Sequence, residues 1–138
     1  AAYRRRLSGP IMDRIDIWIS VAKIDYDKLA ERETTAEHSR DIRRRVAAAR
    51  DRQRKRFERS NKSISYNSEM GATDIESCVV MNDSARETLK SAAVRLSLSG
   101  RAFHRVIKVA QTIADLDASD KIDKSHMLEA LQYREKIT

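Results

Sequence analysis

Residues 99–116 read SGRAFHRVIKVAQTIADL, and this stretch decides the fold class of the chain. Its apolar side chains recur every three to four residues, which is the period of an amphipathic α-helix. These apolar positions are Phe103, Val106, Ile107, Ala110, Ile113 and Ala114. Ser99 stands immediately before them, where a serine side chain accepts a hydrogen bond from a free N–H of the first turn. The sequence therefore predicts a half-buried helix that begins after Ser99.

Helical signals of the same kind flank this stretch. Thr73 with Glu76, and Ser84 with Glu87, have the spacing of capping boxes, so each pair predicts the start of a helix. Asp123 predicts the start of a last helix by the same capping chemistry. The inward-facing side chains expected on these helices are Ala85, Leu89, Ala92, Ala93, Leu96, Met127, Leu128, Ala130 and Leu131. The second half of the chain therefore reads as a helical bundle.

A long basic helix is predicted earlier, from a capping box at Thr34 and Glu37 to about Phe57. Its apolar stripe is narrow and has Gln53 inside it; the stripe consists of Ile42, Val46, Ala49 and Phe57. Residues 40–59 hold ten basic and three acidic side chains, an excess equal to the formal net charge of +7 of the whole chain. Such a concentration is typical of a segment that binds a polyanion, and it is equally typical of a solvated helix face.

Residues 15–21 read IDIWISV and carry apolar side chains at every second position. This period-two alternation in an isoleucine-rich segment predicts a β-strand. A single strand leaves its backbone N–H and C=O groups unpaired, so its partner strands belong to another segment. We therefore expect a mainly α chain with one β element near its start, and a Ser- and Asn-rich loop over residues 58–70.

Composition narrows the class of protein further. The chain of 138 residues is 41% hydrophobic and 36% charged, which is too apolar for a disordered chain and too charged for a membrane protein. No apolar run approaches the roughly 20 residues that a membrane-spanning helix needs. Three glycines and one proline are too few for an all-β fold with many tight turns. Cys78 is the single cysteine, so no internal disulfide is expected, which fits a reducing cytoplasm.

No site for independent catalysis stands out. His38, His104 and His126 lie far apart in the sequence and none has a second ligand at metal-binding spacing, so no metal site is expected. The three glycines cannot build a phosphate-binding loop of the Gly-x-x-x-x-Gly-Lys-Ser/Thr type. We therefore expect that this chain is not an enzyme by itself.

A motif in residues 3–16, YRRRLSGPIMDRID, places a Gly-Pro turn before Asp13 and Arg14 at the entrance of the expected strand. This motif resembles the signature of magnesium-chelatase-like AAA+ ATPases of the ComM/YifB type. Further pieces of the chain resemble the same family in the same order; they are NSEM at 67–70, SGRAFHR at 99–105, TIADL at 112–116 and EALQYR at 129–134. The resemblance covers almost the whole chain.

The resemblance implies that the chain is a C-terminal piece of such an ATPase. Residues 1–24 would be the end of the AAA+ core with one β-strand left over from it, residues 25–70 a basic helix with its connecting loop, and residues 71–138 a helical lid bundle. ATP and Mg²⁺ would be cofactors of the full-length parent, and neighbouring subunits of a homo-oligomeric ring would be its partners.

The resemblance also assigns two arginines to nucleotide sites, and a third is a weaker candidate from its position. Arg14 would be an arginine finger that reaches, in trans, the γ-phosphate bound by a neighbouring subunit, because guanidinium is always charged and planar. Arg101 would be a lid sensor that contacts nucleotide in cis, and Arg105 is a secondary candidate one turn further. The alternatives are a surface pair between Asp13 and Arg14, and a solvated Arg101 without a role.

DNA is an implied partner, since the family is associated with DNA processing and competence. The candidate DNA-binding residues are Arg43, Arg44, Arg50, Arg54 and Lys55. Contacts of this kind neutralise phosphates and are sensitive to salt. The basic side chains surround the predicted helix, however, and no aromatic residue for base stacking stands among them, so a solvated helix remains the alternative.

Two other functions stay open at this point. The chain could be a stand-alone basic helical module that binds nucleic acid or acts as an adaptor, with no nucleotide role. It could also belong to a chelatase-like subunit that partners a metal-inserting complex, although the Ser-Gly-Pro form of the motif favours the ComM/YifB branch.

Overall fold

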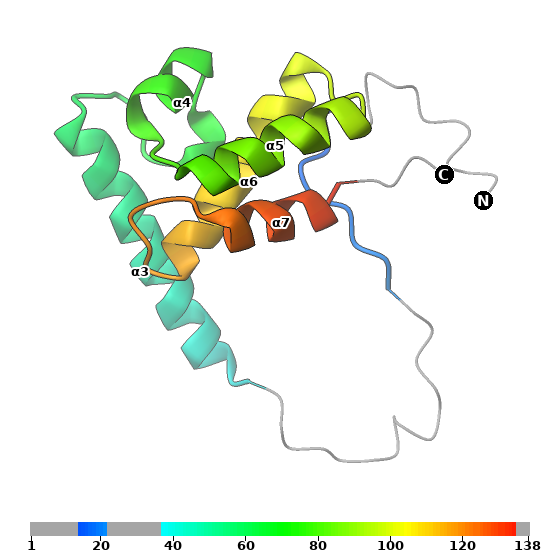
Figure 1. Cartoon of the computed structure of the whole chain (residues 1–138). Helices are drawn as coiled ribbons and strands as arrows, with labels where there is room; N and C mark the ends of the chain where they lie inside the picture. Colours follow the sequence, from blue (N-terminus) through cyan, green and yellow to red (C-terminus); the bar gives the residue numbers. More distant parts are fainter. Residues whose placement is uncertain (1–13, 22–36, 135–138) are drawn as a thin grey trace, which may run out of the picture.

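The described part of the chain is mainly helical. In a computed structural model, residues 14–21 and 37–134 are described. The helices within these ranges are α3 (Ser39–Arg59), the 3₁₀-helix η2 (Asn67–Glu69), α4 (Ala72–Cys78), α5 (Asp83–Arg95), α6 (Gly100–Leu116) and α7 (Lys124–Gln132). Figure 1 shows them gathered into one bundle, which confirms the predicted fold class.

Helix α6 lies at the centre of this bundle (Figure 1). It contacts α7, α3, η2 and α4, while α5 packs on α7. Its side chains Val106, Ile107, Ala110 and Ala114 are at most 3% exposed, so the apolar stripe predicted from the sequence faces the core. The bulkiest apolar side chains of the core are Phe57, Leu89, Ile122 and Met127. Full burial of each of these stabilises the fold by about 1.5–3 kcal/mol.

Two of the predicted helix starts are confirmed. The Ser99 side chain accepts a hydrogen bond from the N–H of Ala102 at 3.1 Å, and α6 begins at the next residue. The Asp123 side chain caps α7 by accepting hydrogen bonds from Ser125 N and His126 N, at 2.8 and 3.1 Å. The Ser125 hydroxyl also donates to this carboxylate, at 2.7 Å, and it is the largest cause of a pKa of Asp123 below its ordinary value, followed by the His126 N–H.

Two other predicted caps are displaced by two residues. Helix α5 is capped by Asn82, which accepts a hydrogen bond from Ala85 N at 2.8 Å, and not by Ser84. Helix α4 is capped at Gly71, whose N–H donates to the Asp74 carboxylate at 2.9 Å. In each case an upstream residue already has the extended backbone of a cap, so the helix begins before the predicted Ser/Thr-x-x-Glu pair.

Helix α3 begins later than predicted and runs slightly further. It starts at Ser39 without a side-chain cap, and ends at Arg59. Glu37 pairs with the Arg45 side chain at 2.8 Å, so it does not act in a capping box; Thr34 lies outside the described residues. The loop that follows α3 is therefore shorter than residues 58–70, and it contains η2.

Three helices end in the same way despite the scarcity of glycine. Asn61, Ser97 and Ala118 have φ of 50°, 48° and 55°, in the left-handed region that favours glycine. The next residue after each of them donates its N–H back to the last turn; these bonds are Lys62 to Phe57 O, Leu98 to Ala93 O and Ser119 to Ala114 O. This pattern is the Schellman motif, which satisfies free carbonyls at a helix C-terminus.

The predicted strand over residues 15–21 does not form. This segment has no strand partner among the described residues, and an unpaired strand cannot satisfy its backbone. It runs instead along the bundle, where Trp18 N donates to Tyr133 O at 2.8 Å. Bridge pairing in the described ranges joins Met81 to Ile122 and so ties the loop before α5 to the loop before α7. The motif residues 3–13 lie outside the described part of the chain.

Candidate functional site

The N-terminus of α6 carries one of the predicted site residues. Arg101 is exposed in the first turn, and no acidic residue stands in that turn. The N–H groups of a first helical turn point out of the helix and favour negative charge. Arg101 adds a positive charge beside them, so this end of α6 has the chemistry of a phosphate-binding position.

The predicted Arg14 lies on a segment that docks on the same helix. Arg14 is exposed, and Asp16 two residues later forms an ion pair with Arg105 of α6. Arg134 donates from Nη1 to the carbonyl of Ile15 at 3.1 Å. Arg105, predicted as a secondary nucleotide contact, is therefore engaged by a carboxylate of its own chain in this structure.

A cleft of about 480 Å³ lies between this docked segment and the bundle. Its walls come from residues 16–19, η2, α6 and α7, and they include Ile17, Ile19, Val109, Ile113, Leu116 and Tyr133. Arg105 and Lys108 contribute positive charge to its lining, and Asp16 and Glu129 contribute negative charge. The Lys108 ammonium donates to the Ser68 carbonyl at 3.1 Å. Burial, and then the Arg105 charge, lower the pKa of Lys108, so the two cations disfavour each other there.

The five predicted DNA-contacting residues of α3 differ in whether they form ion pairs. Arg44 pairs with Asp41 at 3.2 Å, and both Arg54 and Lys55 pair with Asp51, at 2.5 and 2.6 Å. The Lys55 hydrogen bond is the largest cause of a lowered pKa at Asp51. Local acidic partners thus offset part of the positive charge that the sequence shows.

The other two predicted contacts, Arg43 and Arg50, are exposed and form no ion pair with a described residue. The Arg50 guanidinium lies 5.7 Å from the centroid of the Tyr66 ring. Tyr66 is 45% exposed. An aromatic ring therefore does stand beside the basic helix, but it comes from the following loop, where a search of the helix alone could not find it.

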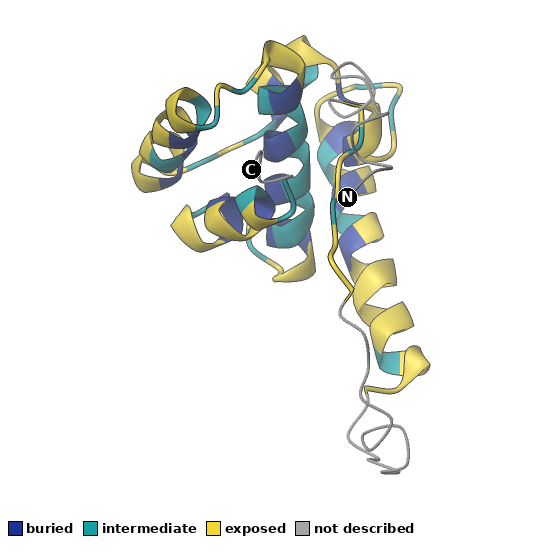
Figure 2. Cartoon of the chain, turned by 90° about the vertical axis from the view of Figure 1, so that its right-hand side faces the viewer, coloured by how far each residue is buried: buried dark blue, intermediate teal, exposed yellow. Residues whose placement is uncertain are grey.

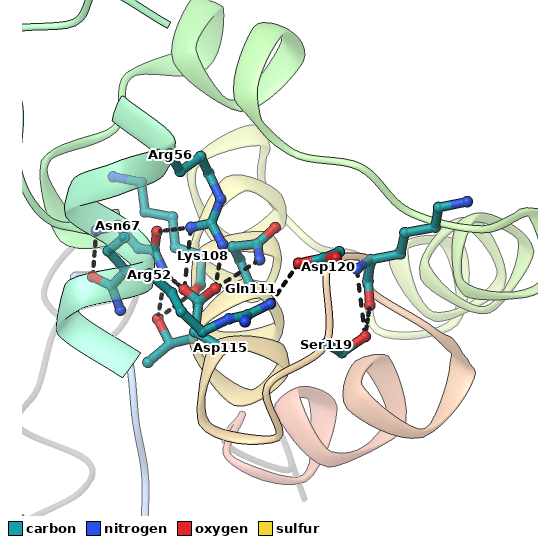
Figure 3. Close-up of polar contacts among 11 residues, drawn as sticks. Arg52, Arg56, Asn67, Lys108, Gln111, Asp115, Ser119 and Asp120 are labelled. Carbon is teal, nitrogen blue, oxygen red and sulfur yellow. Dashed lines mark hydrogen bonds and ion pairs between the residues drawn. The ribbon is translucent and has the colours of Figure 1, made fainter. Parts of the chain in front are cut away.

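Sequence reasoning missed the residues that join α3 to α6. Figure 3 shows Arg56 of α3 pointing at Asp115 of α6, with which it forms a two-pronged ion pair, and also at Asn67 of η2. The Asn67 amide donates to Asp115 at 2.9 Å and to Thr112 at 3.1 Å. The side chain of Asp115 is fully buried, and that of Arg56 is 17% exposed.

The sequence held one signal for these contacts among Arg56, Asn67 and Asp115. Gln53 interrupts the apolar stripe of α3, and its side chain accepts a hydrogen bond from Asn67 N at 3.1 Å. A polar residue in an apolar stripe indicates a buried polar partner. Asn67 and Asp115 also stand in two of the motifs that resemble the chelatase-like ATPases, which gives those motifs a shared structural role.

The comparisons with known proteins agree with these motifs. A family model described as magnesium chelatase, subunit ChlI C-terminal, matches residues 36–134, and one described as magnesium chelatase, subunit ChlI, matches residues 1–29. The chain belongs to the magnesium chelatase ChlI family. The resemblance proposed from the sequence is thereby confirmed.

Two relatives place the chain within this family. It is 36% identical over 132 residues to the YifB protein of Salmonella typhimurium, and 36% identical over 135 residues to the competence protein ComM of Haemophilus influenzae. The matches cover 96% and 98% of the chain, and 25% of each relative. This member of the magnesium chelatase ChlI family thus spans about a quarter of the length of these two relatives.

Two further observations bear on the site of this family member. No helix in residues 14–21 and 37–134 is long and apolar enough to cross a membrane. Within the same ranges, no three His, Cys, Asp or Glu side chains lie close enough together to hold a metal ion.

Proposed function

We propose that this chain forms the helical lid of a Mg-chelatase-like AAA+ ATPase and completes nucleotide sites that the rest of the protein builds. The proposal rests on Arg101, which stands exposed in the first turn of α6 directly after the Ser99 cap. This combination suits the phosphates of a nucleotide bound in cis. Mg²⁺–ATP, when bound, supplies the phosphoryl group that is transferred; the described residues fit its phosphates and not its metal ion.

Arg14 is proposed to act in trans on the nucleotide of a neighbouring subunit in a homo-oligomeric ring. Its support is its exposure at the start of the docked segment and the motif in which it stands. A guanidinium neutralises charge that develops on the phosphoryl oxygens, and in other phosphoryl-transfer enzymes such a finger raises the rate by about 10³–10⁵.

The test uses the full-length protein with Arg14→Ala and Arg101→Ala. The first change should lower kcat and leave nucleotide affinity intact, and the second should weaken nucleotide binding. Mixing the two variant subunits should restore part of the ATPase activity, because some interfaces then combine an intact Arg101 with an intact Arg14 from the neighbour. Arg95→Ala, at the exposed end of α5, is the matched control. Full activity of both variants in assembled rings would reject the proposal.

We also propose that DNA is the substrate on which the ring acts, with contacts from α3. Arg43 and Arg50 support this, since they are exposed and form no ion pair with a described residue, and Arg50 lies beside the exposed Tyr66. Arg54 and Lys55 already pair with Asp51, so they are weaker contributors. Contacts of this type are sequence-independent and depend on salt.

A salt titration of DNA binding tests this part. Arg43→Gln with Arg50→Gln should lower the slope of log affinity against log salt by about 0.9 per lost phosphate contact. Arg54→Gln with Lys55→Gln is the matched pair and should lower it less. Tight DNA binding by the 138-residue chain alone would favour the alternative function, a stand-alone nucleic-acid-binding module. Equal salt slopes for all variants would show that α3 does not contact DNA.

A further inference from the structure

An ion pair connects the second turn of α6 to the segment that follows Arg14. Arg105 Nη1 pairs with Asp16 Oδ1 across 89 positions of the sequence, so the contact is tertiary. The Arg105 side chain is 25% exposed and that of Asp16 is 52% exposed. Arg105 is therefore held on the bundle, whereas Asp16 comes from a segment without secondary structure of its own.

Two hydrogen bonds to main-chain groups of the same segment hold it as well. Trp18 N donates to Tyr133 O at 2.8 Å, and Arg134 donates from its guanidinium to Ile15 O at 3.1 Å. Residues 15–18 are thus attached to α6 through the Asp16 side chain, and through their own main-chain groups to residues 133 and 134 just after α7. Figure 1 shows this segment, in blue, passing beside the end of α7.

We propose that Arg105 is a positioning residue, which through Asp16 holds residues 15–18 on the lid and so fixes Arg14 relative to Arg101. This inference deepens the proposed function and rests on it for the roles of the two flanking arginines. Arg101 and Arg105 stand one turn apart on α6, and Arg14 and Asp16 stand two residues apart. The ion pair therefore carries a movement of α6 with bound nucleotide to the segment of the finger that serves the next subunit, while the contacts to Tyr133 and Arg134 attach the same segment just after α7.

The charges around the pair stabilise it. Lys108 lies in the same cleft, and its pKa is lowered by burial and by the Arg105 charge. Asp16 offsets this repulsion, because its carboxylate acts on Lys108 in the opposite direction. Removing Asp16 would leave the Arg105 and Lys108 charges without this compensation, so the ion pair stabilises both the docked segment and the cleft beside it.

Trp18 provides a direct test, since it is the single tryptophan of the chain and is partly buried in the docked segment. Arg105→Asp and Asp16→Arg should each red-shift its fluorescence and increase its quenching by acrylamide. From the strength of exposed ion pairs, the ratio of docked to undocked segment should fall by a factor of about 2–5. The double exchange, Asp16→Arg with Arg105→Asp, should restore the wild-type signal.

Arg101→Asp is the matched control, because it makes the same charge change one turn away on the exposed start of α6. It should leave Trp18 fluorescence unchanged. Unchanged fluorescence in Arg105→Asp, or failure of the double exchange to restore the signal, would overturn the inference.

Kinetics of the full-length protein separate this inference from the proposed function. Arg105→Asp should lower kcat as Arg14→Ala does, keep nucleotide affinity, and recover in the double exchange. Weakened nucleotide binding with an unchanged Trp18 signal would make Arg105 a nucleotide contact and overturn the positioning role. If Trp18 responds as expected while Arg14→Ala retains full activity, the contact between lid and segment stands and the proposed finger fails.

Discussion

The two halves of α3 have similar sequences and opposite environments. Residues 39–48 are rich in arginine and extend beyond the bundle, where almost every position is exposed (Figure 2). Residues 49–59 are also basic, but Ala49, Gln53 and Phe57 are buried against the rest of the fold. The difference teaches that the role of an arginine in this helix depends on whether α6 lies opposite it, and not on the local density of charge.

Arg43 and Arg56 illustrate this difference. Arg43 is exposed, whereas Arg56 pairs with the fully buried Asp115. Each arginine stands in a run of basic residues that gives no sign of its environment. The following predictions compare matched changes in the two halves.

Arg56→Ala should have the largest effect on stability. It leaves the Asp115 carboxylate buried without its cationic partner, which costs about 3–5 kcal/mol in comparable buried pairs. Arg43→Ala is the matched change in the exposed half and should alter the free energy of unfolding by less than about 0.5 kcal/mol. Urea unfolding followed by circular dichroism measures both. Equal losses in the two variants would show that α3 does not pack on α6 as described.

Phe57→Ala should have an effect of similar size through a different cause. Phe57 has no exposed surface, so its removal loses apolar burial and leaves a cavity, at a cost of about 3–5 kcal/mol. Ile42 belongs to the same stripe but is 43% exposed, and Ile42→Ala should cost well under half as much. The midpoints of thermal unfolding of the two variants provide the comparison; a larger loss for Ile42→Ala would contradict it.

Asn67→Ala should have an intermediate effect. It removes the amide that donates to Asp115 and Thr112, and each buried polar group left unsatisfied costs about 1–3 kcal/mol. Gln132→Ala, on the exposed end of α7, serves as the control and should be nearly neutral. A stability of Asn67→Ala equal to that of the control would mean that η2 does not connect the two helices.

Lys55→Gln should have the smallest effect, which is a change in the titration of the Asp51 carboxyl. The pKa of Asp51 is lowered, chiefly by the Lys55 hydrogen bond, so its stabilising contribution is present at neutral pH and is lost as the pH falls through the lowered pKa. Lys55→Gln should raise the titration midpoint of the Asp51 carboxyl, measured by NMR chemical shift. An unchanged midpoint would mean that the pair does not persist in solution.

Much of the fold follows from local patterns in the sequence. The apolar period of residues 99–116 predicted α6, and the capping chemistry of Ser99 and Asp123 predicted where α6 and α7 begin. The error at Ser84 arose because Asn82, two residues earlier, caps equally well. The strand predicted over residues 15–21 was wrong because alternating apolar residues indicate only which side chains would share a face of a strand. They do not indicate whether a partner strand is present.

The site was predictable only in part. The motifs named Arg14, Arg101 and Arg105, whose nucleotide roles stay predictions, but no spacing showed that Asp16 meets Arg105. The pairing of Arg50 with Tyr66 was likewise hidden, since it joins a helix to a later loop. Contacts of this kind depend on which distant segments pack together in the tertiary structure, and local periodicity does not indicate this.

The sequence by itself determined the helical class, the central stripe of α6, the excess charge of residues 40–59 and the membership in the chelatase family. These properties depend on the period, the capping and the identity of neighbouring residues, and each can be read from a single segment. Only the tertiary structure decided which arginines are buried, which are paired and which are exposed. The reason is physical: a guanidinium takes its role from the carboxylate or ring opposite it, as Asp115 and Tyr66 do for Arg56 and Arg50, and those partners come from distant segments.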